Sequence, residues 1–300
     1  MTNKRCKILS LLVEVKSLVM PILTAAHTIP WTVNSPFKMR PGLARLDETT
    51  PNLFLRDNLA ERYSECKQQL LTEHRARVWL GEADAQVLIE IAKHYQQQTD
   101  IRLAANAEAL TLGMQEDFVI LHDELEGDNY DMRTRFLSVC FPSNWNPSEK
   151  IDLNFHAIHV PVADNAILQA GAKGIIDLAF RKNIMVRHVW LLTPNSDLPS
   201  HPLQRSRLWA DALQQLGDGS LLEQLYFRVE RQTTLPLPDL KRGVFFIRVM
   251  VAPLVDVLHV EPTRAAQLAE ALASMSENIL EYRGMTAALP RLLQELAAFR

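Results

Sequence analysis

The stretch LYFRVERQTTLPLPDLKRGVFFIRVMVAPL (residues 225–254) holds two strand-like runs on either side of a proline-rich turn. Side chains alternate between the two faces of a strand. Arg231 therefore shares a face with Phe227 in the first run, and Arg248 shares a face with Phe246 in the second. The stretch predicts a β-hairpin that carries two cations on an otherwise apolar face.

The pairing register decides how close these two cations lie. If the turn closes symmetrically, with Leu235 opposite Val244, then Arg231 and Arg248 become direct cross-strand neighbours. Like charges in that position repel, and a buried, unpaired cation is costly. An anionic group is therefore expected beside them. It is either an internal carboxylate, such as Glu230 or a helix glutamate, or an anionic ligand, because guanidinium groups suit carboxylates and phosphates.

The remaining sequence alternates between helical and extended patterns. Apolar residues at helical spacing, with turn residues between the segments, predict helices over residues 58–71, 83–97, 163–180, 202–216, 262–278 and 286–299. Extended apolar runs predict strands over residues 117–125, 135–142 and 184–192, in addition to the hairpin. These patterns predict an α+β fold, an antiparallel sheet with helices on one side.

Composition excludes several classes of function. The 300 residues carry a net charge of −3 and no basic tract, so a nucleic-acid partner is not expected. The 10 glycines form neither GxGxxG nor GxxxxGK[ST], which disfavours a glycine-cradled phosphate site. Cys6, Cys66 and Cys140 are far apart, which argues against a zinc ribbon or a disulfide scaffold and favours a reducing, cytoplasmic setting.

The chain begins with a few basic residues, which are followed by an apolar stretch. Glu14 and Lys16 interrupt that stretch, which leaves it too short and too charged for a membrane span. We expect residues 1–35 to form a peripheral or disordered extension, and a signal peptide is the weaker alternative.

Two histidines stand close together in FHAIHVPV (residues 155–162). This stretch is predicted to be extended, which sends His156 and His159 to opposite faces and disfavours a two-histidine metal site. A single axial ligand and an ordinary hydrogen-bonded histidine both remain open, and Pro161 would stiffen the backbone near His159. His188, within a predicted strand, is expected to pack or to form a hydrogen bond.

Several separate strings together resemble one known family, the haem-dependent oxidative N-demethylase α-subunit-like family. They are PFKMRPGL (36–43), VCFPSNWNPSEK (139–150), AIHVPV (157–162), FRVERQTTLPLP (227–238), GVFFIRV (243–249) and ILEYRGM (279–285). The resemblance spans about residues 36–285, and its most specific part is R-x-E-R-Q followed by F-x-I-R. It divides the chain into the extension, a domain over 36–285 and a C-terminal helix over 286–300.

The resemblance implies a PAS-like antiparallel sheet that binds haem b. It also implies a partner reductase with flavin and iron–sulfur centres, activation of O₂ at the haem, and removal of a methyl group from dimethylamine as formaldehyde. Carried onto this chain, His159 becomes the expected iron ligand, and Arg231 and Arg248 become candidates for holding the haem propionates. Arg228 and Glu230 become the catalytic candidates, which orient this network or the substrate ammonium.

One position departs from the family pattern. Where the resemblance leads us to expect R-x-N-W, this chain has Arg187, His188, Val189 and Trp190. The missing asparagine puts the identity of the substrate, and catalysis itself, in question, and it leaves His188 as an alternative iron ligand. A haem-binding sensor without turnover, or an interaction module that has lost its haem, is therefore the alternative hypothesis.

Overall fold

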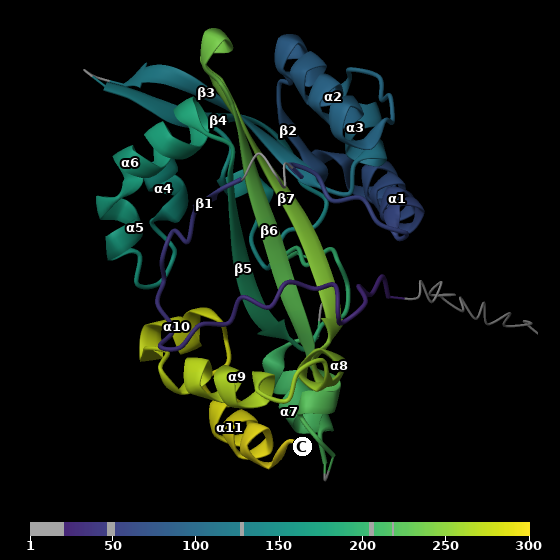
Figure 1. The fold of residues 1–300 in the computed structure, drawn as a ribbon, viewed down its shortest axis with the longest axis vertical. Helices are drawn as coiled ribbons and strands as arrows, with labels where there is room; N and C mark the ends of the chain where they lie inside the picture. The colour runs from purple at the N-terminus through teal and green to yellow at the C-terminus, as the bar shows by residue number, and fades with distance from the viewer. Residues whose placement is uncertain (1–20, 47–51, 127–128, 204–206, 218) are drawn as a thin grey trace, which may run out of the picture.

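The computed structural model describes residues 21–46, 52–126, 129–203, 207–217 and 219–300. Its centre is a seven-stranded antiparallel sheet in the order β1-β5-β6-β7-β3-β4-β2 (Figure 1). The strands are β1 (Ala44–Arg45), β2 (Trp79–Gly81), β3 (Asp117–Glu126), β4 (Asn129–Ser138), β5 (Met185–Thr193), β6 (Tyr226–Leu237) and β7 (Arg242–Pro253). The predicted α+β class with an antiparallel sheet is confirmed.

The two longest strands, β6 and β7, form the predicted hairpin. They pair along their whole length, with Leu235 opposite Val244 and Arg231 opposite Arg248, so the predicted register is confirmed. A short 3-10 turn (Pro238–Leu240) joins them, and Lys241 closes it in the left-handed conformation, φ 53°. A proline at the start of such a turn presets its backbone angle.

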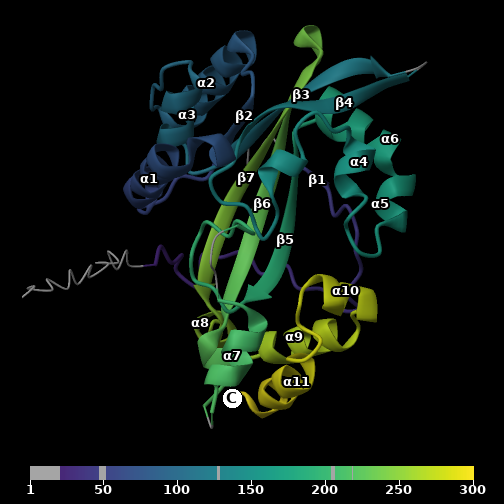
Figure 2. The same cartoon turned by 180° about the vertical axis from the view of Figure 1, so that it is seen from behind.

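Helices make up most of the remaining structure (Figure 2). They are α1 (Ala60–Val78), α2 (Ala85–Thr99), α3 (Ala107–Gly113), η1 (Pro147–Glu149), α4 (Phe155–His159), α5 (Ala166–Ala170), α6 (Ala172–Ile176), the π-helical turn η2 (Asp177–Lys182), α7 (Trp209–Gln215), η3 (Leu222–Gln224), η4 (Pro238–Leu240), α8 (Leu254–His259), α9 (Arg264–Ala273), α10 (Glu277–Tyr282) and α11 (Leu289–Ala298). No helix in the described part of the chain is both long enough and apolar enough to cross a membrane.

Helices cover both faces of the sheet, and the expectation of helices on one side is wrong. On β3, Phe118 packs with buried residues of α2 and α3, whereas its neighbour Val119 packs with buried residues of α6 and η2. Neighbouring residues of a strand point to opposite faces. The two helical groups therefore lie on opposite sides of the sheet, as Figure 1 shows.

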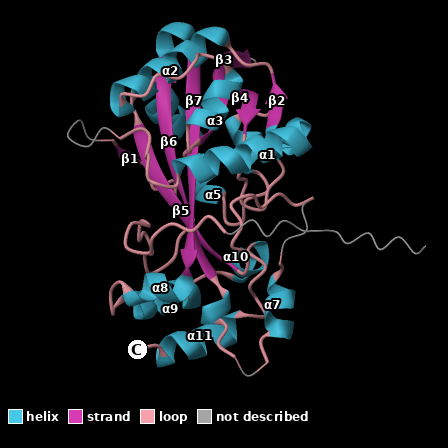
Figure 3. Cartoon of the chain, turned by 90° about the vertical axis from the view of Figure 1, so that its right-hand side faces the viewer, coloured by secondary structure: helices cyan, strands magenta, loops and turns pink. Residues whose placement is uncertain are grey.

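A further core lies at the other end of the long strands, under the C-terminal helices (Figure 3). Trp31 stacks on Phe227 at 5.2 Å between ring centroids, and Trp190 stacks on Phe227 at 6.0 Å. Ile29 and Leu292 are buried in the same cluster. Residues from both the expected extension and the expected C-terminal helix thus contribute to this core, while residues 1–20 lie outside the described part of the chain.

Several predicted elements differ from the observed ones because of local capping. Residues 155–159 are helical, so the prediction of an extended stretch is wrong. The Asn154 side chain accepts a hydrogen bond from the Ala157 amide at 2.9 Å and so caps the helix. The predicted helix over 163–180 is divided at Gly171, and Ser276 caps a new helix within the predicted 262–278 segment.

Of the predicted helix over 202–216, the helical part is Trp209–Gln215, and residues 204–206 are among those not described.

A fully buried ion pair ties α1 to the start of β3. The Nζ of Lys67 lies 3.1 Å from Oδ1 of Asp117, and both side chains are completely inaccessible to solvent. Lys67 also donates to the carbonyl oxygens of Met114 and Glu116 at 3.2 and 2.7 Å, and Asp117 accepts from the Phe141 amide at 2.7 Å. The pair therefore anchors three segments at one point.

We predict that Lys67→Met lowers the free energy of unfolding by about 3–5 kcal/mol, because it leaves the carboxylate of Asp117 buried without its counter-ion. Urea unfolding measures this change. The control is Lys93→Met, which removes a surface pair with Glu90 at 3.3 Å and should cost at most about 1 kcal/mol. Equal effects of the two substitutions would contradict the prediction.

Candidate functional site

The register of the three central strands assigns their charged residues to two faces of the sheet. His188 pairs with Arg231, which pairs with Arg248, so these three side chains share one face. Arg187 and Glu230 lie on the other face, because each is next in sequence to a member of that row. Arg231 and Arg248 are thus separated by the sheet from Arg187 and Glu230.

Arg231 and Arg248 are both buried, and both bind an extended segment that crosses their face. Arg231 donates to the carbonyl oxygens of Leu53, at 3.1 Å, and of Asn52. Arg248 donates to Oδ2 of Asp57 at 2.9 Å, and its guanidinium lies 4.0 Å from the ring centroid of Tyr63. The acidic partner of Arg248 is therefore an internal carboxylate, which is one of the two alternatives that the sequence left open.

The same segment is held by polar residues at the start of β3. The Leu55 amide donates to Oε1 of Glu116 at 2.8 Å, and the Asp57 amide donates to Gln115 at 2.9 Å. Burial raises the pKa of Glu116, while the nearby charge of Arg248 acts in the opposite direction. The hairpin arginines and this acid together fix residues 52–57 against the sheet.

On the face of Glu230, Arg228 is enclosed by main-chain oxygens. It is 1% exposed and donates to the carbonyls of Asp197, Phe141, Pro142 and Leu198 at 2.8–3.2 Å. Burial lowers its pKa to about 10. This geometry makes Arg228 a positioning group that clamps two loops together.

Glu230 is the acidic centre of this face, and it is 6% exposed. Ser143 links it to Arg228, because the Ser143 hydroxyl accepts from Nε of Arg228 at 2.8 Å and donates to Oε1 of Glu230. Gln232 donates to Oε2 of Glu230 at 2.7 Å. The structure thus brings the two predicted catalytic residues, Arg228 and Glu230, into one hydrogen-bonded chain.

His159 lies at the end of α4, whose first residue, Phe155, packs in the core on the Arg187 side of the sheet. Its Nδ1 lies 2.7 Å from the Phe155 carbonyl oxygen. A carbonyl can only accept, so Nδ1 carries the proton and Nε2 keeps a free lone pair. No partner of Nε2 occurs in the described part of the chain. Nε2 is thus available to accept a hydrogen bond or to bind a metal ion.

Burial lowers the pKa of His159, and the charges of Arg187 and Lys150 lower it further. Burial also lowers the pKa of Arg187, and the negative charge of Glu230 opposes that effect. Arg187 is thus the electrostatic neighbour of both His159 and Glu230. The site on this face consists of a neutral imidazole, a cation and a carboxylate.

The other residues named from the sequence lie around this centre or apart from it. Val189, which stands where an asparagine was expected, pairs directly with Glu230 and is only partly buried. His188 lies on the opposite face, where burial and the charge of Arg231 lower its pKa. The structure places His159, Glu230 and Arg228 on the same side of the sheet, with Arg187 acting on both His159 and Glu230, and it places Arg231, Arg248 and His188 on the opposite face.

Sequence reasoning missed Arg187 and Ser143 as members of this site. Arg187 could have been noticed as the polar residue on the face of β5 that also holds Met185 and Val189.

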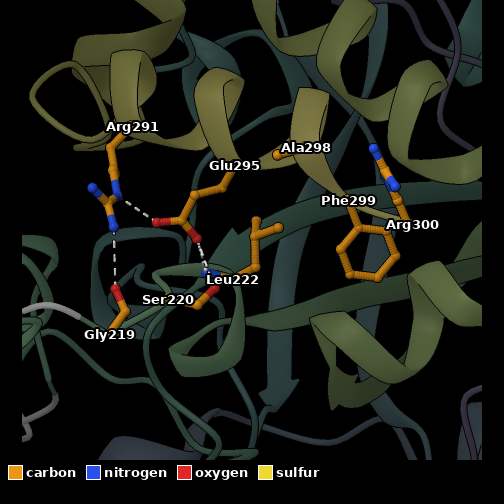
Figure 4. Close-up of a pocket in the computed structure, with 8 residues that line it drawn as sticks. All are labelled: Gly219, Ser220, Leu222, Arg291, Glu295, Ala298, Phe299 and Arg300. Carbon is orange, nitrogen blue, oxygen red and sulfur yellow. Dashed lines mark hydrogen bonds and ion pairs between the residues drawn. The ribbon is translucent and has the colours of Figure 1, made fainter.

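A separate hollow of about 410 Å³ lies beside α11, at the far end of the molecule from α4 (Figures 1 and 4). Its polar centre is Glu295, which accepts from the amides of Leu221 and Leu222 at 3.0 and 3.1 Å and from Arg291. These bonds satisfy the carboxylate and cap a short 3-10 helix. The hollow therefore reflects the joining of α11 to the loop before β6 and not the chemistry around His159.

We predict that the His159 ring is neutral at pH 7, with its proton on Nδ1. Its folded pKa lies below the ordinary value, so the unfolded chain takes up this proton first as the pH falls. The stability that this group contributes is present above about pH 6.5 and is lost as the pH falls through the folded pKa. Nitrogen-15 correlation spectra of the histidine rings measure both properties, and a charged ring or a proton on Nε2 at pH 7 would contradict them.

The sequence was compared with curated proteins and with models of protein families. A search among curated proteins found no match. The model of one protein family, described as haem-dependent oxidative N-demethylase, alpha subunit-like, matches residues 54–293. This range includes α4, every strand of the sheet except β1, and every residue of the His159 site. The chain belongs to the haem-dependent oxidative N-demethylase, alpha subunit-like family.

Proposed function

We propose that this chain is the haem-binding subunit of a monooxygenase that removes an N-methyl group from a small alkylamine. The observation that carries the proposal is the His159 imidazole, whose Nδ1 is held by the Phe155 carbonyl at 2.7 Å while Nε2 stays free. Family membership supports the same conclusion, because the family is described by haem-dependent oxidative N-demethylation.

The residues around His159 fit a haem, which we take to be haem b in a PAS-like sheet. A haem needs one imidazole nitrogen with a free lone pair, and a second hydrogen bond of the ring is the usual way to orient it. The described residues hold no cluster of three or more metal-binding side chains, and one axial histidine does not need such a cluster. His159 is the ligand that we propose.

In the overall reaction, the amine, O₂, two electrons and two protons give the demethylated amine, formaldehyde and water. Bound haem would supply the redox chemistry that activates O₂. Glu230 would pair with the ammonium group of the substrate, and Ser143 and Gln232 would hold its carboxylate in place. Arg228 would act as a positioning residue, because its Nε donates a hydrogen bond to the Ser143 hydroxyl.

The electrons must come from outside this chain. Two electrons per turnover imply a reductase partner, and we propose one that carries flavin and iron–sulfur centres, in line with an alpha-subunit-like family. A cytoplasmic setting fits the free thiols of Cys66 and Cys140. Burial raises the pKa of Cys66 to about 11, which keeps its thiol protonated.

A second candidate is a haem-binding sensor or interaction module without turnover. Val189 favours it, because a partly exposed apolar side chain lies directly opposite Glu230 where the resemblance led us to expect an amide. Haem binding is common to both candidates. Release of formaldehyde from an N-methylamine separates them.

We predict that His159→Ala weakens hemin binding at least about tenfold, because the iron loses its protein ligand. The measurement is a hemin titration followed by the Soret band, which should also shift when CO is added to the reduced wild type. The control is His156→Ala, which removes an exposed histidine from the same helix. Unchanged spectra in the His159 variant would rule out this ligand, and a wild type that binds no hemin would rule out both candidates.

We predict that Glu230→Gln lowers kcat/KM for dimethylamine by about 10- to 100-fold, because the substrate ammonium loses a charge-assisted hydrogen bond. Formaldehyde release in the presence of a reductase measures it. The control is Glu124→Gln, which alters an acid already bound to Arg135 at 2.7 Å elsewhere in the sheet. Equal kinetics in wild type and the Glu230 variant would contradict the assigned role.

A further inference from the structure

Of the five arginines in β5, β6 and β7, four have side chains that bind other groups of the described chain and one does not. Arg228, Arg231 and Arg248 bind protein groups as described above, and Arg242 donates to Oδ2 of Asp84 at 3.0 Å. The side chain of Arg187 makes no hydrogen bond, ion pair or ring contact with any residue that the structure describes, and its Nε is sealed from solvent. It is the one guanidinium of these strands without a partner in the described chain.

Glu230 is not the hydrogen-bonded partner of Arg187. Its two carboxylate oxygens already accept from Ser143 and Gln232, and Ser143 connects it to the fully buried Arg228. Glu230 therefore acts on Arg187 through its charge and forms no hydrogen bond with it. Arg187 is partly buried, with its Nε sealed from solvent. A guanidinium that has lost part of its hydration without gaining a hydrogen-bonded partner is receptive to an anion.

We propose that Arg187 binds a carboxylate group of a ligand that lies beside His159. A guanidinium group presents paired N–H donors that match the two oxygens of a carboxylate. This inference rests on the haem binding of the proposed function, and it extends the substrate class from simple alkylamines to those that carry a carboxylate. The carboxylate has two possible sources. One is a propionate of the haem, and the other is an acidic substrate such as an N-methylated amino acid.

The proposal replaces the role that the sequence suggested for Arg231 and Arg248. Those two arginines lie on the opposite face, where residues 52–57 supply their partners. Arg187, together with Lys150, is instead a residue whose charge acts on His159.

The test compares wild type with Arg187→Gln, using two pairs of probes. The first pair is hemin and hemin dimethyl ester, which lacks free carboxylates, and binding is followed by the Soret band. The second pair is N,N-dimethylglycine and dimethylamine, titrated into haem-loaded protein and followed by the shift of the same band. Arg242→Gln is the matched control, because it removes a guanidinium from the same sheet that already has its own acid.

If Arg187 holds a haem propionate, wild type should bind hemin about 10- to 100-fold more tightly than the ester, and Arg187→Gln should abolish that difference. If it holds a substrate carboxylate, the preference for dimethylglycine over dimethylamine should be lost in the same variant. Arg187→Lys, which keeps the charge, should retain part of either preference, and it provides the test should the glutamine variant fail to fold.

Equal discrimination by wild type, Arg187→Gln and Arg242→Gln in both probe pairs would overturn the proposal. In that case wild type would still bind hemin, so the proposed function would stand. Failure of wild type to bind hemin or its ester would overturn both.

Discussion

A guanidinium group that leaves water must find carbonyl, carboxylate or aromatic partners, and this constraint organises the centre of the sheet. Arg231 and Arg248 satisfy it by binding residues 52–57, which fixes that segment across one face. Arg228 satisfies it by clamping the loops that contain Phe141 and Leu198. The arginines of the hairpin therefore bind segments that are far away in sequence and hold them against the sheet.

The same constraint separates Arg228, Arg231 and Arg248, whose guanidinium groups bind protein groups, from Arg187, for which we propose a ligand. On the side of the sheet that α4 covers, Arg187 has no partner in the described chain, and it lies near a histidine whose Nε2 is free. Under the proposed function, in a family described by haem-dependent oxidative N-demethylation, both groups would bind the same haem. A metalloporphyrin brings both an iron for the imidazole and carboxylates for the guanidinium.

The hairpin could be predicted from the sequence because its information is local. Period-two alternation and the proline-rich turn defined both strands, and symmetric closure placed Arg231 opposite Arg248. The partners of those arginines could not be predicted in the same way, because Asp57 lies 191 positions away from Arg248 along the chain. The helix at His159 was missed although Asn154 offered a capping signal, since five residues are too few to establish a helical period.

The most direct test of this account is a crystal structure of the hemin-loaded protein. The account predicts iron bound to Nε2 of His159, with Nδ1 still donating to the Phe155 carbonyl, and Arg231 and Arg248 still bound to residues 52–57. Iron bound to His188, or propionates that displace residues 52–57 from those two arginines, would contradict it.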